Sequence, residues 1–438
     1  MLDKIFRLKE NDTSLKTEIL AGITTFMTMA YIICVQPVVL SKCGMDFGSV
    51  MMATCLASAL ATILMGITAN YPIALAPAMG HNFFFAYTVC LGMGIPWQTA
   101  LGAVFLSGTL FIVLSLFGMR ERIVDAVPIS LKSGIAVGIG LLIAFVGLQW
   151  SGIVAGDPVT MVKLGDLGST PVLLSVFGIA VISVLRLLKI KGAILIGIIS
   201  STVLGLNLDI VKFHGFIQCP PSLEPTALKL DILGAFDLGL VTVIFVFFFL
   251  DLFDTIGTLI GISEEGGFMK GGKLPKAREA LLSDAIGTMA GAALGTSTVT
   301  SYVESGSGVA EGGRTGLANM VTASLFLVAI FFYPLIKTIG GGIHIGPTEL
   351  HPVIAPALII VGSMMLKAIS KINLEDPSES IPAFLTLLVM PLTFSITEGI
   401  SFGFISYTFL KLISGRGREV RPALYVFSAL FIVRYIFL

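Results

Sequence analysis

The stretch FFFLDLFDTIGTLIG, residues 247–261, is apolar enough to cross a lipid bilayer, yet it contains two aspartates, Asp251 and Asp254. An ionised carboxylate at the bilayer centre costs roughly 3 kcal/mol on insertion scales, so such residues are functional-site candidates by default. Together with Thr255 and Thr258 they form one polar stripe on a helix. A structural network with a neighbouring helix is the alternative, but two like charges without a basic residue in the stretch argue against a simple ion pair.

The composition of the whole chain is that of a membrane protein. Of its 438 residues, 55% are hydrophobic and 12% are charged, whereas soluble domains average about 25% charged residues. The formal net charge is zero, so nothing indicates a nucleic-acid partner. The five cysteines show no metal-binding spacing, and we do not expect the charged N-terminus, which lacks an apolar core, to be a cleaved signal peptide.

Apolar windows recur along the chain and predict an all-α polytopic protein with about fourteen transmembrane segments, seven in each half. The first half has windows at 17–40, 48–68, 72–91, 96–118, 130–149, 171–188 and 192–208. The second half has windows at 238–262, 279–297, 298–313, 316–338, 352–370, 381–396 and 397–414. A last apolar stretch, 421–438, is either a fifteenth span or a helix lying in the membrane interface.

The placement of basic residues predicts the orientation. With a cytoplasmic N-terminus, 21 of the 27 Lys and Arg residues fall inside, among them Arg120, Arg122, Lys270 and Lys273. We therefore expect a multi-pass protein of the inner or plasma membrane with its N-terminus in the cytoplasm.

Seven spans per half would give the halves opposite topology, which is the inverted-repeat plan of many secondary transporters. The third span of each half is interrupted, as this plan requires: YPIALAPAMGHNFFFAYTV at 71–89 and GTSTVTSYVESGSGVAEGG at 295–313. In each, a short extended run precedes a half-helix, so strands should lead into half-helices in spans 3 and 10. Ser301 and Glu304 form a Ser-x-x-Glu pattern that predicts a capping box at the second half-helix.

Several polar residues near these half-helices are candidates for a site. Glu304 is either a cap only or a member of a cavity at mid-membrane. Asn82, which has both a donor and an acceptor, serves either helix packing or binding. We expect Asp284, beside a charged cytoplasmic loop, to be solvated.

At DLFDTIGTLIG, TSYVESGSGVAEGGRTGLANMV and NYPIALAPAMGHNFFFAYTV the sequence resembles the azaguanine-type purine permeases of the nucleobase–cation symporter family. The likeness continues in AGITTFMTMAYI, residues 21–32, and in MPLTFSITEGISFGFISY, residues 390–407. The resemblance implies proton-driven import of adenine, guanine or hypoxanthine. It implies no cofactor, with a proton as the coupling ion and sodium left open.

The resemblance also implies an architecture. Two inverted seven-helix repeats would form a core domain from 17–118 and 238–340, and a gate or scaffold domain from 119–237 and 341–438. Proteins of the wider fold are commonly homodimers that work by an elevator motion.

The family's motifs imply site residues in this chain. Asp251 and Glu304 correspond to carboxylates that contact the purine, Asp254 to an acidic residue needed for proton-coupled transport, and Gly80 and Asn82 to pocket positions.

The neighbours of these positions complete the candidate substrate site. Ser301 and Tyr302 lie beside Glu304, and either Tyr302 or Phe83 could stack on a flat base. Ala78, His81 and Phe83 depart from the family's usual Pro-Gly-Met-Gly-Leu-Asn-Ala pattern, and a narrow pocket at Phe83 is expected.

Two other functions are alternatives. A transporter of the same fold for another nucleobase or a small anion is the nearer alternative, although three acidic residues and no basic one around the cavity disfavour an anion. An intramembrane aspartyl protease is remote, because it needs its two aspartates on separate helices, whereas Asp251 and Asp254 share one.

Overall fold

The computed structural model describes residues 2–116, 127–236, 241–269, 274–345 and 348–437. The four basic residues Arg120, Arg122, Lys270 and Lys273, and the predicted domain boundaries at 118/119 and 237/238, lie outside the described residues. Within these ranges the chain is helical, with three short two-stranded sheets. Seven of the described helical segments are long and apolar enough to cross a membrane. The prediction of an all-α polytopic membrane protein is confirmed, while the count of fourteen spans stays a prediction.

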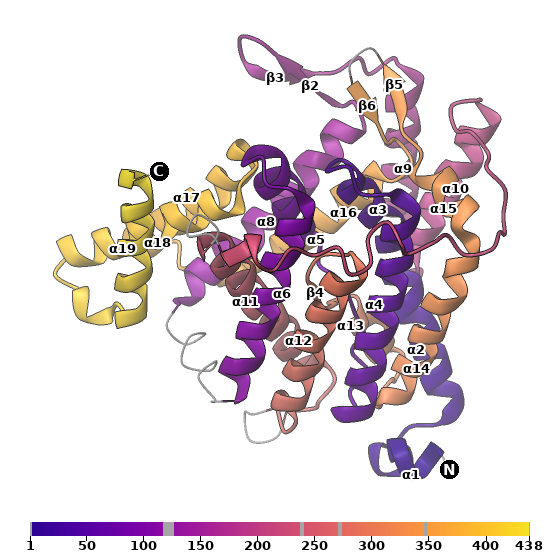
Figure 1. The fold of residues 1–438 in the computed structure, drawn as a ribbon, viewed down its shortest axis with the longest axis horizontal. Helices are drawn as coiled ribbons and strands as arrows, with labels where there is room; N and C mark the ends of the chain where they lie inside the picture. The colour runs from indigo at the N-terminus through magenta and orange to yellow at the C-terminus, as the bar shows by residue number, and fades with distance from the viewer. Residues whose placement is uncertain (1, 117–126, 237–240, 270–273, 346–347, 438) are drawn as a thin grey trace. The chain divides into compact units, whose positions relative to one another are not determined.

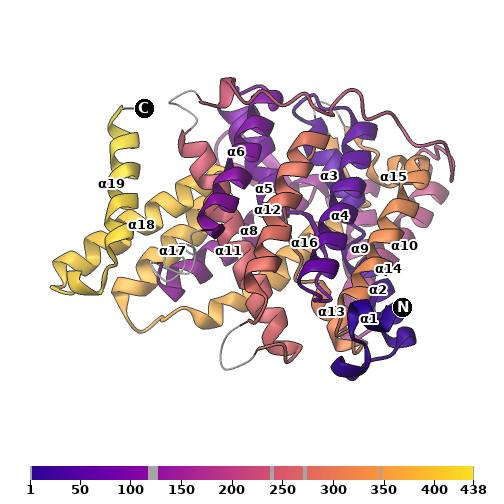
Figure 2. The ribbon, with the colours of Figure 1, turned by 60° about the horizontal axis from the view of Figure 1, so that its bottom comes forward.

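The chain forms two compact units, and the first comprises Met1–Ser115 and Gln149–Ala357. Its principal helices are α2 (Leu15–Met29), α3 (Ile32–Ser41), α4 (Phe47–Thr68), α5 (Met79–Phe83), α6 (Trp97–Leu116), α9 (Thr170–Leu187), α10 (Ala193–Asn207), α11 (Val241–Glu265), α12 (Ala277–Leu294), α13 (Ser305–Ala310), α14 (Gly316–Ala329) and α15 (Tyr333–Gly340). A π-helical segment, η2 (Phe84–Gly92), continues α5. Figure 1 shows α4 beside α12, and Figure 2 shows the same neighbours from another side.

The three sheets of this unit are antiparallel pairs. They join β1 (Leu75–Pro77) to β4 (Val299–Ser301), β2 (Val154–Asp157) to β3 (Met161–Leu164), and β5 (Ile343–Ile345) to β6 (Thr348–Leu350). Only the first pair joins distant halves of the sequence. It leads into α5 and α13, so the predicted strands and half-helices are confirmed.

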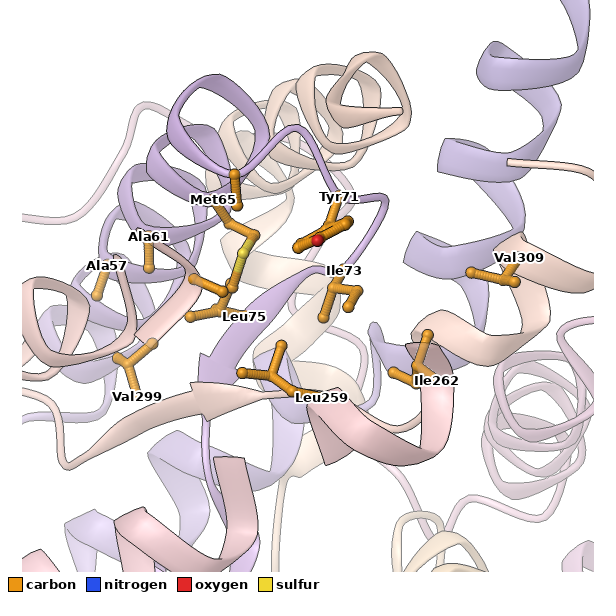
Figure 3. Close-up of a cluster of buried hydrophobic side chains, with 12 residues drawn as sticks. Ala57, Ala61, Met65, Tyr71, Ile73, Leu75, Leu259, Ile262, Val299 and Val309 are labelled. Atoms are coloured by element: carbon orange, nitrogen blue, oxygen red, sulfur yellow. The ribbon is translucent and has the colours of Figure 1, made fainter. Parts of the chain in front are cut away.

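A cluster of buried apolar side chains surrounds the β1–β4 pair (Figure 3). Leu75 of β1 and Val299 of β4 pack with Ala61 of α4 and Leu259 of α11, and all four are at most 2% exposed. Because α12 and α13 also contribute residues to it, namely Ala280 and Val309, this core fixes the strands relative to four helices.

Helices α4 and α14 approach each other closely because glycines lie at their contact. A Cβ atom built on Gly316 would lie 2.0 Å from the carbonyl oxygen of Gly66, and a Cβ on Gly66 would lie 2.8 Å from that of Gly316. Neither position can accept a side chain without moving backbone.

The first predicted span, 17–40, is two helices rather than one. Helix α2 ends at Met29, α3 begins at Ile32, and Ala30 and Tyr31 form a turn between them. The interruption places Tyr31, 2% exposed, inside the protein.

The second unit comprises Leu116–Leu148 and Leu358–Leu438, so its boundaries fall at the last residue of α6 and inside α8 (Ile129–Trp150) and α16 (Ala355–Met365). It also contains α17 (Pro377–Thr393), α18 (Ile396–Ile413) and α19 (Pro422–Phe437). Helix α19 lies within the predicted 421–438 stretch, and whether it spans the membrane stays open.

A cluster of charges joins the ends of the helices in this second unit. The Lys411 side chain is 0% exposed and its Nζ lies 2.8 Å from Glu419 Oε2 and 3.1 Å from Glu379 Oε1. Arg416 contacts Asp376 and Glu419. The guanidinium of Arg416 and the ammonium of Lys411 lower the pKa of Glu419 to about 2.

Candidate functional site

The β1–β4 pair is the base on which the candidate site is built. Leu75 pairs with Ser301, Ala76 with Thr300 and Pro77 with Val299. Extended backbone at membrane depth must be satisfied by protein groups, because no water is available in the hydrocarbon region.

Two threonines form the same pair of hydrogen bonds with backbone N–H and C=O groups at the outer edges of this strand pair. The Thr62 hydroxyl of α4 donates to the Leu75 carbonyl at 3.1 Å and accepts from the Leu75 N–H at 2.9 Å. The Thr288 hydroxyl of α12 donates to the Val299 carbonyl at 2.8 Å and accepts from its N–H at 3.2 Å. The matching roles of α4 and α12 agree with two halves related by a two-fold axis.

The second half-helix does not begin as predicted. Glu304 itself occupies the N-cap position of α13, has helical backbone angles and makes no side-chain cap. Ser301 belongs to β4, where its backbone pairs with Leu75. The capping-box prediction is therefore wrong, because strand pairing takes Ser301 out of the helix and frees the Glu304 carboxylate for another partner.

That partner is Tyr31, in the turn between α2 and α3. Its hydroxyl donates to Glu304 Oε1 at 2.7 Å, and both residues are buried, with Glu304 8% exposed. Tyr302 lies close to both and donates its hydroxyl to the Pro77 carbonyl at 2.5 Å. The strand pair and the α2–α3 turn thus position the carboxylate.

The two aspartates of α11 lie in different environments. Asp254 is exposed and accepts a hydrogen bond from the Thr300 hydroxyl at 3.3 Å. Asp251, one turn earlier, is 0% exposed. A Cβ atom built on Gly257 or Gly261 would meet nothing within 4 Å, so the helix face beyond Asp254 borders open space.

Asp254 and Glu304 form an acidic pair beside β4. Asp254 is close enough to Glu304 and to Tyr31 to interact with them electrostatically. No ion pair among the described residues involves either carboxylate. Their oxygen atoms can accept hydrogen bonds from a ligand.

Asn82 binds the opposite half of the protein. It is fully buried in α5, and its side-chain oxygen accepts from the Ser297 hydroxyl. Gln36 of α3 donates to the hydroxyls of Thr296 at 2.9 Å and Ser297 at 3.2 Å. This network joins the start of α5 to the segment that precedes β4.

The remaining candidates are also buried. The Phe83 ring is 1% exposed; it stacks on Tyr87 with centroids 5.8 Å apart and lies 6.4 Å from the Trp150 ring. Gly80 lies in the first turns of α5, and its carbonyl accepts from the backbone N–H of Phe84. In the part of the chain that the structure describes, the buried Ser301 hydroxyl has no hydrogen-bond partner.

The structure adds residues that the sequence did not identify. Tyr31 and Thr300 contact the two carboxylates directly. Asp284 was expected to be solvated, and this is wrong: it is 0% exposed in α12, where it accepts from the Thr255 hydroxyl at 2.7 Å. Its bond to Thr255 fixes the turn of α11 that contains Asp254.

The chemistry of the site follows from its donors and acceptors. Carboxylates accept hydrogen bonds and have no donors when ionised, whereas a tyrosine or threonine hydroxyl can do both. A small ligand with several N–H groups matches this set. The described residues contain no group of three or more His, Cys, Asp and Glu that could hold a metal ion.

Comparison with known proteins gives matches over nearly the full chain. The Permease family matches residues 16–402. A putative permease of Methanocaldococcus jannaschii is 51% identical, covering 100% of this chain and 98% of that protein. The adenine permease AdeP of Escherichia coli is 42% identical, covering 100% and 96%. The guanine/hypoxanthine permease PbuG of Bacillus subtilis is 45% identical, covering 99% of each.

A solved structure has the same fold. The transmembrane domain of the cyanobacterial bicarbonate transporter BicA is similar with a TM-score of 0.65, covering 88% of this chain and 97% of that one. The sequences are only 15% identical, so the likeness concerns the fold alone.

Proposed function

This chain belongs to the Permease family, and on that premise we propose that it transports a purine nucleobase across the membrane. Relatives at 42% and 45% identity over nearly their whole length are adenine and guanine/hypoxanthine permeases, which supports a purine as the substrate. The chain is a multi-pass membrane protein and a transporter rather than an enzyme, so the protease hypothesis is rejected.

One observation supports this proposal most directly: Asp254 and Glu304 are close enough to interact, and neither forms an ion pair with a basic group among the described residues. A purine is flat, neutral and surrounded by N–H donors and ring-nitrogen acceptors. Glu304 accepts from the base, and its bond from Tyr31 fixes the carboxylate in one orientation. A hydrogen bond from the base to this charged group contributes about 1.5–3 kcal/mol.

The residues around this carboxylate complete the proposed substrate site. The Ser301 hydroxyl and the Tyr302 ring lie beside Glu304 and contribute polar and apolar contacts to the base. Gly80, Asn82 and Phe83 support the site from α5. Asp251 is fully buried, so its contact with the base requires a movement of α11 and stays a prediction.

Coupling to a proton is the second part of the proposal. Asp254 is the exposed one of the two aspartates in α11 and takes up the proton, since open space borders its helix face. The N-terminus is proposed to be cytoplasmic, in the inner or plasma membrane. The core domain, 17–118 and 238–340, moves against the gate domain, 119–237 and 341–438, in an elevator motion within a homodimer.

Uptake into proteoliposomes tests the substrate. Labelled hypoxanthine uptake is measured against unlabelled adenine, guanine, uracil and bicarbonate at a hundredfold excess. The proposal requires competition by at least one purine and none by bicarbonate. Competition by uracil or bicarbonate alone would instead establish a pyrimidine or anion transporter.

Coupling is tested separately with Asp254→Asn. The variant should bind hypoxanthine and exchange it across the membrane, but it should not accumulate it when a proton gradient is imposed. Asp166→Asn is the control variant, because Asp166 is exposed and lies in a remote loop. Asp284→Asn is unsuitable as a control because Asp284 contacts α11. Wild-type accumulation by Asp254→Asn would exclude Asp254 as the proton carrier.

A further inference from the structure

Two cysteines from separate spans meet in the first unit. Cys43 follows the end of α3, and Cys90 lies in the π-helical segment η2. The Cys43 Sγ lies 3.7 Å from the carbonyl oxygen of Ala86, to which it donates a hydrogen bond. The thiols of Cys43 and Cys90 are also within hydrogen-bonding reach of each other.

The geometry of the helix explains why the two thiols meet. Cys90 lies four residues after Ala86, so both are on the same face of the segment. Side chains on a helix lean towards its N-terminus, which directs the Cys90 thiol back over the Ala86 turn. The Cys43 thiol occupies this same place.

The two thiols differ in access. Cys43 is partly exposed, whereas Cys90 is 8% exposed. A small reagent would therefore reach the Cys43 thiol more readily than the Cys90 thiol. With the N-terminus in the cytoplasm, as proposed above, both cysteines lie at the outer ends of their spans. The outer side of the membrane is the side on which disulfides form and persist.

We propose that Cys43 and Cys90 are a modification site that forms an intramolecular disulfide when a small disulfide oxidant is present. The Cys43 thiolate attacks one sulfur of the oxidant, a mixed disulfide forms, and one oxidant thiol leaves. The Cys90 thiolate then attacks the Cys43 sulfur, and the second oxidant thiol leaves. The two cysteines lose two protons and two electrons, and the oxidant gains them as two thiols.

The bridge would tie the end of α3 to η2. Helix α3 contains Gln36, which binds Thr296 and Ser297, and η2 continues the half-helix that contains Asn82. The disulfide would thus constrain two elements that position the candidate site. It would raise the unfolding temperature, because it removes conformations from the unfolded chain.

The purified full-length protein is incubated with oxidised glutathione, its free thiols are alkylated, and non-reduced peptides are identified by mass spectrometry. Of the five cysteines, Cys43 and Cys90 should appear as one linked pair, and the other three should be alkylated after unfolding. Oxidation should raise the unfolding temperature of the wild type and not that of Cys43→Ser or Cys90→Ser.

The chain contains two matched controls. Cys34 and Cys55 also interact with each other, but they are 6% and 0% exposed, so they should stay reduced. Cys219 is exposed and single, and Cys219→Ser should leave the linked pair unchanged. Alkylation of both Cys43 and Cys90, or glutathione retained on Cys43 alone, would overturn the proposal. Hypoxanthine uptake by Cys43→Ser reports on the transport function independently.

Discussion

The Glu304→Gln variant tests the candidate site most sharply. The substitution keeps the length and shape of the side chain, and its remaining oxygen can still accept from the Tyr31 hydroxyl. The other carboxylate oxygen becomes an NH₂ group, so a donor faces the N–H of a bound base. A buried donor pair cannot form a hydrogen bond, and both groups stay desolvated.

The expected loss follows from the bond that disappears. A hydrogen bond to a charged group contributes about 1.5–3 kcal/mol. At about 1.4 kcal/mol per tenfold change, hypoxanthine binding should weaken by roughly tenfold to a hundredfold. Tyr31→Phe removes only the hydroxyl that orients Glu304 and leaves both carboxylate oxygens able to accept from the base, so binding should weaken by less than in Glu304→Gln.

Both variants are compared with the wild type by equilibrium binding of labelled hypoxanthine to purified protein. Thermal unfolding without ligand shows whether a loss of binding reflects a loss of folding. Unchanged affinity in Glu304→Gln, with wild-type unfolding, would show that the carboxylate does not contact the base. A larger loss in Tyr31→Phe than in Glu304→Gln would show that Tyr31 itself contacts the base.

Three further variants test the framework. Gly316→Ala should prevent stable folding, because the new Cβ would lie 2.0 Å from the Gly66 carbonyl oxygen. Gly257→Ala is the control: its Cβ would meet nothing within 4 Å, so the variant should unfold at the wild-type temperature. The two variants are compared by size-exclusion chromatography and thermal unfolding. Thr288→Val should lower the free energy of unfolding by about 2–3 kcal/mol, because it leaves two buried backbone groups of β4 without hydrogen-bond partners. A variant as stable as the wild type would show that Thr288 is not needed to satisfy the strand. Lys411→Met should lower the free energy of unfolding by about 2–3 kcal/mol. This is less than the roughly 3–5 kcal/mol lost when a fully buried ion pair is broken, because the acidic partners of Lys411 are partly exposed. An unchanged unfolding temperature would show that the charge cluster does not stabilise the protein.

Much of the membrane architecture was predictable because its signals are local. Long apolar runs mark the helices, and the extended run before Pro77 and the run at 298–300 mark the two strands. The same period that identifies a helix also places Asp251 and Asp254 near one another. The period does not show that Asp254 is exposed and Asp251 buried, because their exposure depends on which helices pack against α11.

What was not predictable depends on partners far along the chain. Tyr31 lies 273 residues before Glu304, and nothing in either local sequence pairs them. Asp284 is close in sequence to a charged loop, yet it is buried and accepts a hydrogen bond from the Thr255 hydroxyl of another helix. Ser301 and Glu304 match a local capping pattern, but pairing of β4 with β1 decides their conformation instead.

The electrostatics of the site favour a neutral ligand over an anion. Helix N-termini attract anions with a partial charge of about +0.5 each, and the effect decreases within the first turn. Helix α13 has six residues, so it supplies only a short dipole. Each carboxylate at the site bears a full negative charge when ionised, and neither forms an ion pair among the described residues. The acidic pair therefore outweighs the helix ends, and a ligand that binds at Glu304 must be a donor of hydrogen bonds rather than a negative charge. A purine base satisfies this requirement, and bicarbonate does not.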